Sequence, residues 1–69
     1  MQLVVRYRGK DVILEFDREK IKASDILKVL NLSKDFAFVV KNGEIVPENE
    51  EITQTDEIRV INAISGGKF

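Results

Sequence analysis

The chain contains no cysteine and no histidine among its 69 residues. Without cysteine it has no disulfide bond, no thiolate nucleophile and no cysteine-ligated zinc or iron–sulfur site. Without histidine, the usual base at neutral pH and the most common protein ligand of metals are missing. The serine, threonine and tyrosine hydroxyls then have no evident base to activate them. We therefore expect a protein that is not itself an enzyme and that holds no metal and no stably bound cofactor.

An excess of charge of one sign and long hydrophobic runs are also missing. The 11 basic and 12 acidic residues give a net charge of −1, so the chain lacks the overall positive field that attracts nucleic acid. No apolar run approaches the length of a membrane span or of a signal peptide. These features predict a cytoplasmic protein whose partners are proteins, with neither nucleic acid nor membrane among them.

What is present is sufficient for one small domain. Hydrophobic residues make up 43% of the chain and charged residues 33%, which suits an apolar core with a charged surface. A chain of 69 residues leaves no room for a second domain. We expect residues 1–64 to form the domain and residues 65–69 to be a flexible C-terminal tail.

The N-terminal part of the chain has the pattern of a β-hairpin. Residues 3–7 and 12–16 are rich in β-branched and aromatic side chains, and Arg8-Gly9-Lys10 between them contains a turn-forming glycine. Side chains alternate between the two faces of a strand, which places Val4, Arg6 and Ile13 together on one face. The other face has the larger apolar set, so we expect it to pack in the core.

Residues 24–31 change to a helical period. Ile26, Leu27 and Leu30 form one apolar stripe of an amphipathic helix. Ser24 suits the N-cap and Asn31 suits the helix end. A helix this short is not stable alone, so we expect it to lie across the strands.

Strand patterns return after the helix. Residues 36–41 and 44–46 flank Asn42-Gly43, a pair typical of the type I′ hairpin turn. Residues 48–56 are polar and predict a loop, whereas residues 57–63 alternate again as a final strand. Strands on both sides of one helix predict an α+β fold, with a mixed sheet of four to five strands packed on that helix.

The sheet face away from the helix is predicted to be partly apolar. An apolar area surrounded by charge is typical of a protein-docking surface. Scattered exposed aliphatics, or a register shifted by one residue that would bury this set, are the alternatives. The alternation places on this face the following aliphatic side chains and arginines: Val4, Ile13, Val40, Ile61, Ala63, Arg6 and Arg59.

Acidic residues gather in the last loop and at the start of the final strand. Their spacing lacks the glycine and the alternating ligands of an EF-hand loop. We interpret them as a solvated acidic loop rather than a cation site. They are Glu48, Glu50, Glu51, Asp56 and Glu57.

After the final strand the chain continues as Ile64-Ser65-Gly66-Gly67-Lys68-Phe69. A Gly-Gly pair near a terminus can be no more than a frayed end. Two residues without a Cβ can also enter a channel too narrow for any side chain. The order of strand, short spacer and Gly-Gly favours the second interpretation.

The order of elements and two motifs together resemble the ThiS/MoaD family of sulfur carriers. The motifs are the hairpin Asn42-Gly43-Glu44-Ile45-Val46-Pro47 and the ending Ala63-Ile64-Ser65-Gly66-Gly67. The likeness covers essentially the whole chain, and both motifs look closer to the thiamine-type carrier than to the molybdopterin-type carrier. The resemblance implies the ubiquitin-like β-grasp fold, although a fold alone does not determine a function.

The resemblance also implies a chemistry centred on Gly67. In the family, an adenylyltransferase that resembles ubiquitin-activating enzymes uses its own ATP and Mg²⁺ to adenylate the carboxylate of the final glycine. Gly66 and Gly67 would thread into that enzyme. Sulfur from a persulfide donor protein then gives a thiocarboxylate, and an enzyme of thiamine- or molybdopterin-type cofactor synthesis, or of tRNA thiolation, accepts it. The lack of cysteine is consistent with this scheme, because the main-chain terminus holds the sulfur.

Lys68 and Phe69 depart from the family pattern, in which the chain ends at Gly-Gly. Removal of both residues by a processing peptidase is the interpretation that we favour, and an inactive relative or a cloning remnant are the others. Two further functions stay open. One is a ubiquitin-like modifier joined to lysines through Gly67, and the other is a β-grasp binding module with an inert tail.

Overall fold

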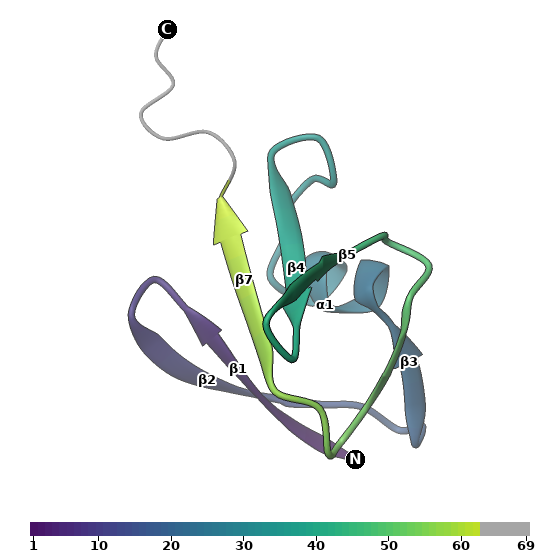
Figure 1. The fold of residues 1–69 in the computed structure, drawn as a ribbon. Helices are drawn as coiled ribbons and strands as arrows, with labels where there is room; N and C mark the ends of the chain where they lie inside the picture. The colour runs from purple at the N-terminus through teal and green to yellow at the C-terminus, as the bar shows by residue number, and fades with distance from the viewer. Residues whose placement is uncertain (63–69) are drawn as a thin grey trace, which may run out of the picture.

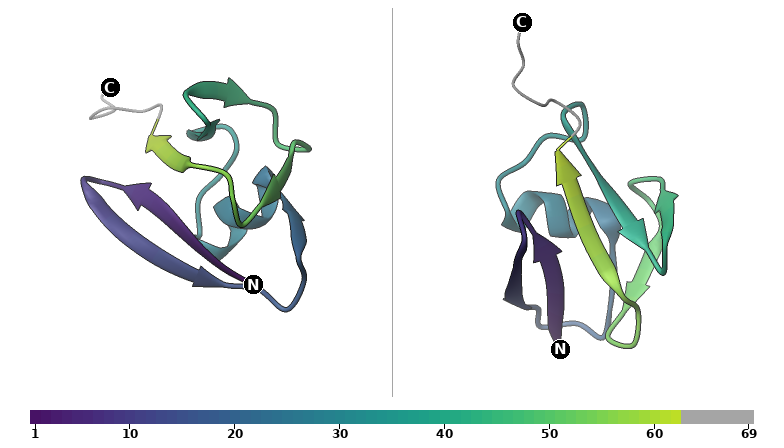
Figure 2. Two further views of the ribbon diagram at one scale, coloured as in Figure 1. Left: turned by 60° about the horizontal axis from the view of Figure 1, so that its bottom comes forward. Right: turned by 60° about the vertical axis from the view of Figure 1, so that its left-hand side comes forward.

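Strands from both ends of the chain meet in one mixed β-sheet. The structure, a computed structural model, describes residues 1–62. The sheet has the order β2-β1-β7-β4-β5, in which β1 and β7 are parallel and the other neighbours are antiparallel. The helix α1 (Ala23–Val29) lies across one face (Figure 1, Figure 2). The predicted mixed sheet on one helix is confirmed. Its strands are β1 (Gln2–Tyr7), β2 (Lys10–Glu15), β4 (Ala37–Lys41), β5 (Glu44–Val46) and β7 (Ile58–Asn62).

Two tight turns set the register of the two hairpins. Arg8 and Gly9 have φ angles of 55° and 76°, and Asn42 and Gly43 have φ angles of 52° and 89°. Two consecutive residues in the left-handed region make the turn whose twist matches that of the flanking strands. Tyr7 therefore pairs with Lys10 in the β1–β2 hairpin, and the β4–β5 hairpin is closed in the same way.

The core lies between the helix and one face of the sheet. Leu3 and Val5 of β1 are almost fully buried, as are Val39 of β4 and Val60 of β7. Ile26 of the helix is fully buried against them. The alternation of the strands thus turns one set of side chains inward, and the faces predicted from the sequence are confirmed for β1, β2 and β7.

The helix begins two residues earlier than its predicted N-cap implies. Ser24 is not its N-cap, because Lys22 occupies that position and the Asp25 carboxylate accepts the Lys22 backbone N–H at 2.9 Å. The acidic side chain of the first turn therefore replaces the predicted hydroxyl cap. At the other end Asn31 has φ 60°, and the N–H of Leu32 reaches the carbonyl of Leu27 at 2.8 Å. Together with the bond from the Asn31 N–H to the Lys28 carbonyl, at 3.0 Å, this bond completes a Schellman motif. Asn31 therefore ends the helix as predicted.

The predicted polar loop over residues 48–56 contains a strand, which corrects the sequence interpretation. Strand β6 (Glu51–Thr53) pairs with β3 (Lys20–Lys22) in a separate two-stranded sheet. Ile21 and Ile52 face each other in this pair and are buried at 2% and 0% exposure. One inward side chain per strand is too short a pattern to show an alternation.

A network of polar side chains holds the turn between β6 and β7. The Asp56 carboxylate accepts the Thr53 backbone N–H at 2.8 Å and the Asn42 side-chain amide at 3.2 Å. Asn42 in turn accepts the Glu57 backbone N–H at 2.9 Å. The bond from the Thr53 N–H holds the pKa of Asp56 below its ordinary value. The turn that begins β7 is therefore tied to the β4–β5 turn.

We expect Ile52→Ala to lower the free energy of unfolding by about 2–5 kcal/mol, because it leaves a cavity under the two-stranded sheet. Ile45→Ala is the matched control, since Ile45 is 67% exposed. Its expected cost is about 0.5 kcal/mol. Urea unfolding followed by circular dichroism measures both. Equal midpoints for the two variants would show that β3 and β6 do not belong to the folded core.

We expect Asp56→Ala to lower the free energy of unfolding by about 1–2 kcal/mol at neutral pH, because the Thr53 N–H and the Asn42 amide lose their acceptor. A carboxylate with a lowered folded pKa stabilises the fold above its unfolded pKa, near 3.8. The difference from wild type should therefore shrink as the pH falls below about 3.8. Asp17→Ala, at a fully exposed side chain, is the control. Urea titrations at several pH values test this, and a gap that persists at low pH would contradict it.

Candidate docking surface

The sheet face opposite α1 contains the residues that the sequence places on a docking surface. Val4 and Ile13 are directly paired across β1 and β2 and are 53% and 64% exposed. Ile61 of β7 is 42% exposed. Arg6 of β1 and Arg59 of β7 are exposed and directly opposite each other. These residues are therefore accessible on one face, as the alternation predicts.

Val40 requires a correction. It lies on the predicted face, because it pairs with Arg59 on one side and Ile45 on the other. Its side chain is only 9% exposed, however, so its exposure was overestimated. A side chain between two paired strands is covered by its neighbours, which alternation alone does not show.

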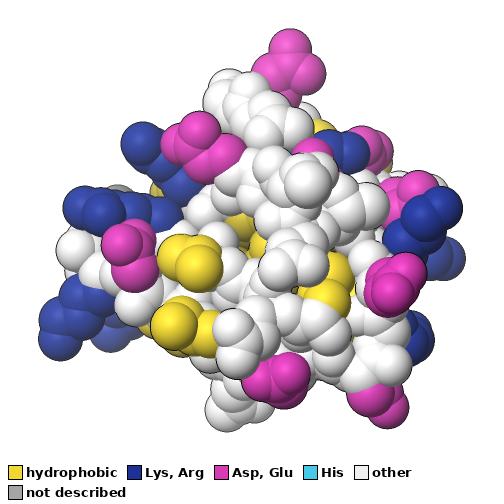
Figure 3. All heavy atoms as spheres, turned by 90° about the horizontal axis from the view of Figure 1, so that it is seen from below, with side chains coloured by type: hydrophobic (Ala, Val, Ile, Leu, Met, Phe, Trp, Pro, Cys, Tyr) yellow, Lys and Arg dark blue, Asp and Glu magenta, His cyan; other side chains and the backbone are white. Residues whose placement is uncertain are grey.

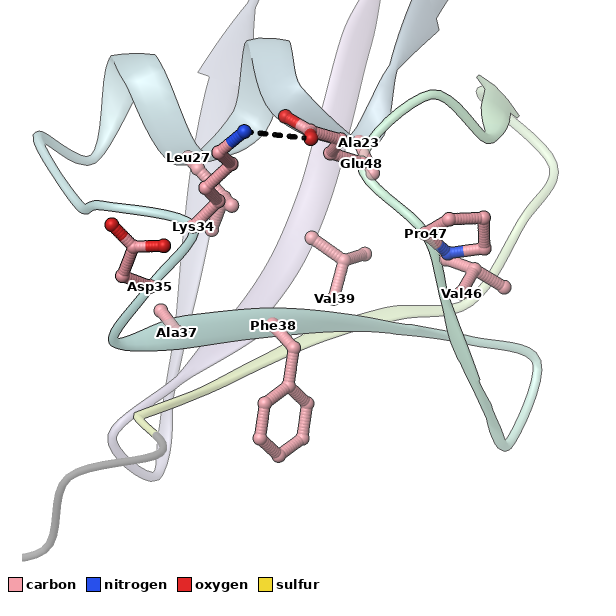
Figure 4. Close-up of a pocket in the computed structure, with 10 residues that line it drawn as sticks. All are labelled: Ala23, Leu27, Lys34, Asp35, Ala37, Phe38, Val39, Val46, Pro47 and Glu48. Atoms are coloured by element: carbon pink, nitrogen blue, oxygen red, sulfur yellow. Dashed lines mark hydrogen bonds and ion pairs between the residues drawn. The ribbon is translucent and has the colours of Figure 1, made fainter.

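Two apolar side chains of this face were missed by the sequence analysis. Phe38 pairs with Ile61, and its ring points away from the residues that face the helix (Figure 4). Ile45, at the sheet edge, is the most exposed large hydrophobic residue of those described. The Asn42-Gly43 turn would have located Ile45, because a two-residue turn fixes Lys41 opposite Glu44 and therefore Val40 opposite Ile45.

The apolar surface is in two parts rather than one. We call Phe38, Ile45 and Ile61 the main apolar patch, and Val4 with Ile13 the minor patch. The charged row Asp11, Arg6 and Arg59 lies between them by the register of the three strands. The Arg6 guanidinium is 3.2 Å from the Asp11 carboxylate. A partner on this face would thus meet two apolar areas separated by charge.

The predicted tail residues follow directly on this surface. β7 lies between β1 and β4 in the sheet and ends at Asn62, at the opposite end of the molecule from the N-terminus (Figure 1). Ala63, Gly66 and Gly67 lie outside the described residues. β7 is paired on both sides from Ile58 to Val60, and Ile61 and Asn62, the last described residues, are paired with β4 alone.

A separate hollow of about 390 Å³ opens between the helix and the β4–β5 hairpin (Figure 4). Leu27, Val39 and Val46 give it an apolar lining. The Lys34 ammonium donates a hydrogen bond to the Glu48 carboxylate at 3.1 Å across it, which raises the pKa of Lys34. The side chains that line it include no serine, threonine or cysteine nucleophile, and one of its two carboxylates, that of Glu48, is paired with Lys34. The hollow therefore does not have the composition of a catalytic site.

The acidic residues of the last connection serve the fold locally. Glu48 pairs with Lys34, and Glu50 accepts a hydrogen bond from Lys41 at 2.9 Å. Asp56 holds the turn before β7. Within residues 1–62 no group of three or more acidic side chains is arranged to hold a metal ion. None of the helices in the same part of the chain is long and apolar enough to cross a membrane.

Comparison with known proteins identifies the family. The sequence pattern of the ThiS family matches residues 3–67, which is nearly the whole chain and ends at the second glycine of the pair. The chain belongs to the ThiS family. ThiS proteins are small sulfur carriers, not enzymes, and work with partner enzymes of thiamine biosynthesis. The family resemblance expected from the sequence is confirmed.

Two solved structures show the same fold. A crystal structure of the thiamine biosynthesis protein ThiS from Geobacter metallireducens matches with a TM-score of 0.63 and 17% identity, over 94% of this chain and 100% of that chain. A solution structure of a thiamine biosynthesis protein from the same organism also matches with a TM-score of 0.63. The identity is 18%, over 97% of this chain and 91% of that chain. The ThiS β-grasp fold is therefore present here.

We expect Ile61→Asp to leave the fold intact, at a cost of about 1 kcal/mol, because the side chain is exposed on the outer face. Val60→Asp, the next residue of the same strand, should cost at least about 3 kcal/mol, because it buries an unpaired charge against the helix. Urea unfolding of both variants tests this assignment of faces. Unfolding of the Ile61 variant together with a stable Val60 variant would reverse it.

Proposed function

We propose that this chain is a sulfur carrier of thiamine synthesis whose reactive atom is the carboxyl carbon of Gly67. The observation that supports this is the extent of the family match, which ends at Gly67 and leaves Lys68 and Phe69 beyond it. The carbonyl carbon of Gly67 is held in a peptide bond to Lys68. Hydrolysis of that bond by a peptidase, with water supplying the new carboxylate oxygen, would have to come first.

Activation then follows from the chemistry of carboxylates. A carboxylate is a poor electrophile, and a mixed anhydride with AMP is a good one. In the proposed step, a Gly67 oxygen attacks the α-phosphorus of ATP in a partner adenylyltransferase, and pyrophosphate leaves with magnesium. The terminal sulfur of a donor persulfide next attacks the acyl carbon and displaces AMP. The product is an acyl disulfide between Gly67 and the donor protein. A thiol then attacks the donor's sulfur, which releases the chain as a thiocarboxylate and leaves a disulfide between that thiol and the donor.

The sheet face described above would hold the chain on the adenylyltransferase. Residues 63–67 can span at most about 17 Å when fully extended. The partner's active site must therefore lie within that reach of Asn62, so the docking surface has to be near the end of β7. Ile61 and Phe38 of the main apolar patch meet this condition, because Ile61 precedes Asn62 and pairs with Phe38. Val4 and Ile13 would extend the contact across the sheet.

We expect a chain that ends at Gly67 to support ATP–pyrophosphate exchange by the ThiS-activating adenylyltransferase, whereas the chain that ends at Phe69 should not. In the longer chain the Gly67 carbonyl is an amide, and the terminal carboxylate belongs to Phe69, whose side chain is too bulky for a channel of glycine width. A chain that ends at Gly66 is the matched control and should also be inactive, because its terminal carboxylate stops about 3.5 Å short.

Intact-mass measurement of the protein from its own cells completes the test. Loss of Lys68-Phe69 together with an oxygen-to-sulfur exchange supports the carrier. Branched conjugates to lysines would instead support a ubiquitin-like modifier. Retention of the full-length mass, together with no exchange activity of the Gly67-ended chain, would indicate a binding module and contradict the proposal.

A further inference from the structure

Three arginines lie beside β7, around a hollow that extends to Asn62 at its end. Arg6 of β1 and Arg59 of β7 are directly opposite each other across the parallel pair, and Arg8 occupies the β1–β2 turn next to them. All three line one hollow of about 370 Å³, together with Ile61 and Asn62. We refer to Arg6, Arg8 and Arg59 as the arginine cluster. It borders the main apolar patch, because Ile61 belongs to both.

The cluster is unfavourable for the isolated fold. Like charges placed directly opposite on one face of a sheet repel each other. The net charge of the chain is −1, so this local excess does not follow from a generally basic composition. In the space-filling view from the N-terminal end, Lys and Arg side chains gather at the side of the β1–β2 turn and also at the opposite side, with Asp and Glu among them (Figure 3). A repulsion of this kind points to a ligand that relieves it.

Few acidic groups of the described residues neutralise the cluster. Arg6 forms an ion pair with Asp11, and both side chains are more than half exposed. Within residues 1–62 no carboxylate lies within 4 Å of the cationic nitrogens of Arg8 or Arg59. Asp56 and Glu57 lie on the other side of Arg6 and Arg59, around a neighbouring hollow. The positive excess therefore faces the end of β7, where the chain continues toward Gly67.

The chemistry of the hollow fits a peptide segment. The Arg8 guanidinium lies 5.4 Å from the centre of the Tyr7 ring, so this arginine rests on an aromatic face that holds it in place. Arginine and aromatic side chains beside an apolar patch are the composition of protein–protein interfaces. The planar guanidinium binds carboxylates through two parallel hydrogen bonds.

We propose that the arginine cluster binds an acidic segment of the enzyme that activates the carrier. This inference rests on the proposed function, and it adds the charge of the partner surface to it. The apolar patch would supply contact area, whereas the arginines would select the partner and orient the end of β7. Electrostatic pairing of this kind acts on the association rate and depends on salt.

The test compares Arg59→Gln and Arg8→Gln, each in a chain that ends at Gly67, with wild type in ATP–pyrophosphate exchange. Each substitution should raise the carrier concentration for half-maximal exchange roughly tenfold at low salt, with an unchanged maximal rate. At high salt, which screens the attraction, the difference from wild type should shrink. Arg18→Gln, in the connection between β2 and β3, removes an equal charge away from the cluster and should change the value less than twofold.

Two further measurements test whether Arg6 and Arg59 repel each other and whether the cluster binds a nucleotide phosphate instead of an acidic segment. Arg59→Gln should unfold at a higher urea concentration than wild type, because it removes the repulsion from Arg6. In nuclear magnetic resonance spectra, ATP alone should not shift the side-chain signals of the three arginines. A shift by ATP would assign the cluster to a nucleotide phosphate and overturn the proposal.

The failure of this inference differs from the failure of the proposed function. Arginine variants that are activated like wild type, or that are impaired equally at all salt concentrations, overturn the acidic-segment proposal alone. A Gly67-ended wild-type chain that is never adenylated overturns the proposed function, and the acidic-segment proposal with it.

Discussion

The parallel pairing of β1 with β7 is the interaction on which the rest of the structure depends. It joins residues from the two ends of the described chain, and no local turn can connect parallel neighbours. The loop-closure entropy of the intervening chain must therefore be offset by the core that the pairing completes, in which Val5, Ile58 and Val60 are nearly fully buried. Because β4 pairs on the other side, β7 is an inner strand from Ile58 to Val60, and β4 alone holds it from there to Asn62. The segment that leads to Gly67 thus begins two residues beyond the part of β7 that is held on both sides.

The same pairing gives the two faces of the sheet different tasks. Inward side chains such as Val60 pack against α1, and outward neighbours such as Arg59 and Ile61 remain accessible. Two arginines placed directly opposite each other on a sheet this small lower its stability. Their position is fixed by the parallel register, because the pairing of Val5 with Ile58 in the core places Arg6 opposite Arg59. The fold therefore fixes the position of the two arginines, and within the described residues Asp11 forms an ion pair with Arg6 but not with Arg59.

The sequence was sufficient to predict the elements that depend on local rules. Alternation assigned the faces of β1, β2 and β7, and the Asn42-Gly43 pair fixed a hairpin, because both act over neighbouring residues. It was insufficient where distant segments cover each other. The β3–β6 pair was missed because each strand turns one side chain inward, Ile21 or Ile52, and Val40 was judged exposed because its cover comes from β5 and β7. The arginine cluster was also missed, since Arg6 and Arg59 meet only through the parallel register.

A carrier whose terminus is activated by a partner enzyme, as proposed here, contributes position to the reaction. Under the proposed function, its reacting carbon is that of Gly67, separated from the sheet by residues 63–67, which reach at most about 17 Å. A longer tether would let the docking surface lie anywhere, and a shorter one would not enter a partner's active site. In the proposed reaction this length would link partner recognition to the chemistry, because only contacts close to Asn62 could hold the chain while Gly67 reacts. The surface near that point has both an apolar patch and a basic cluster, so in the proposed complex contact area and charge would act close to the terminus.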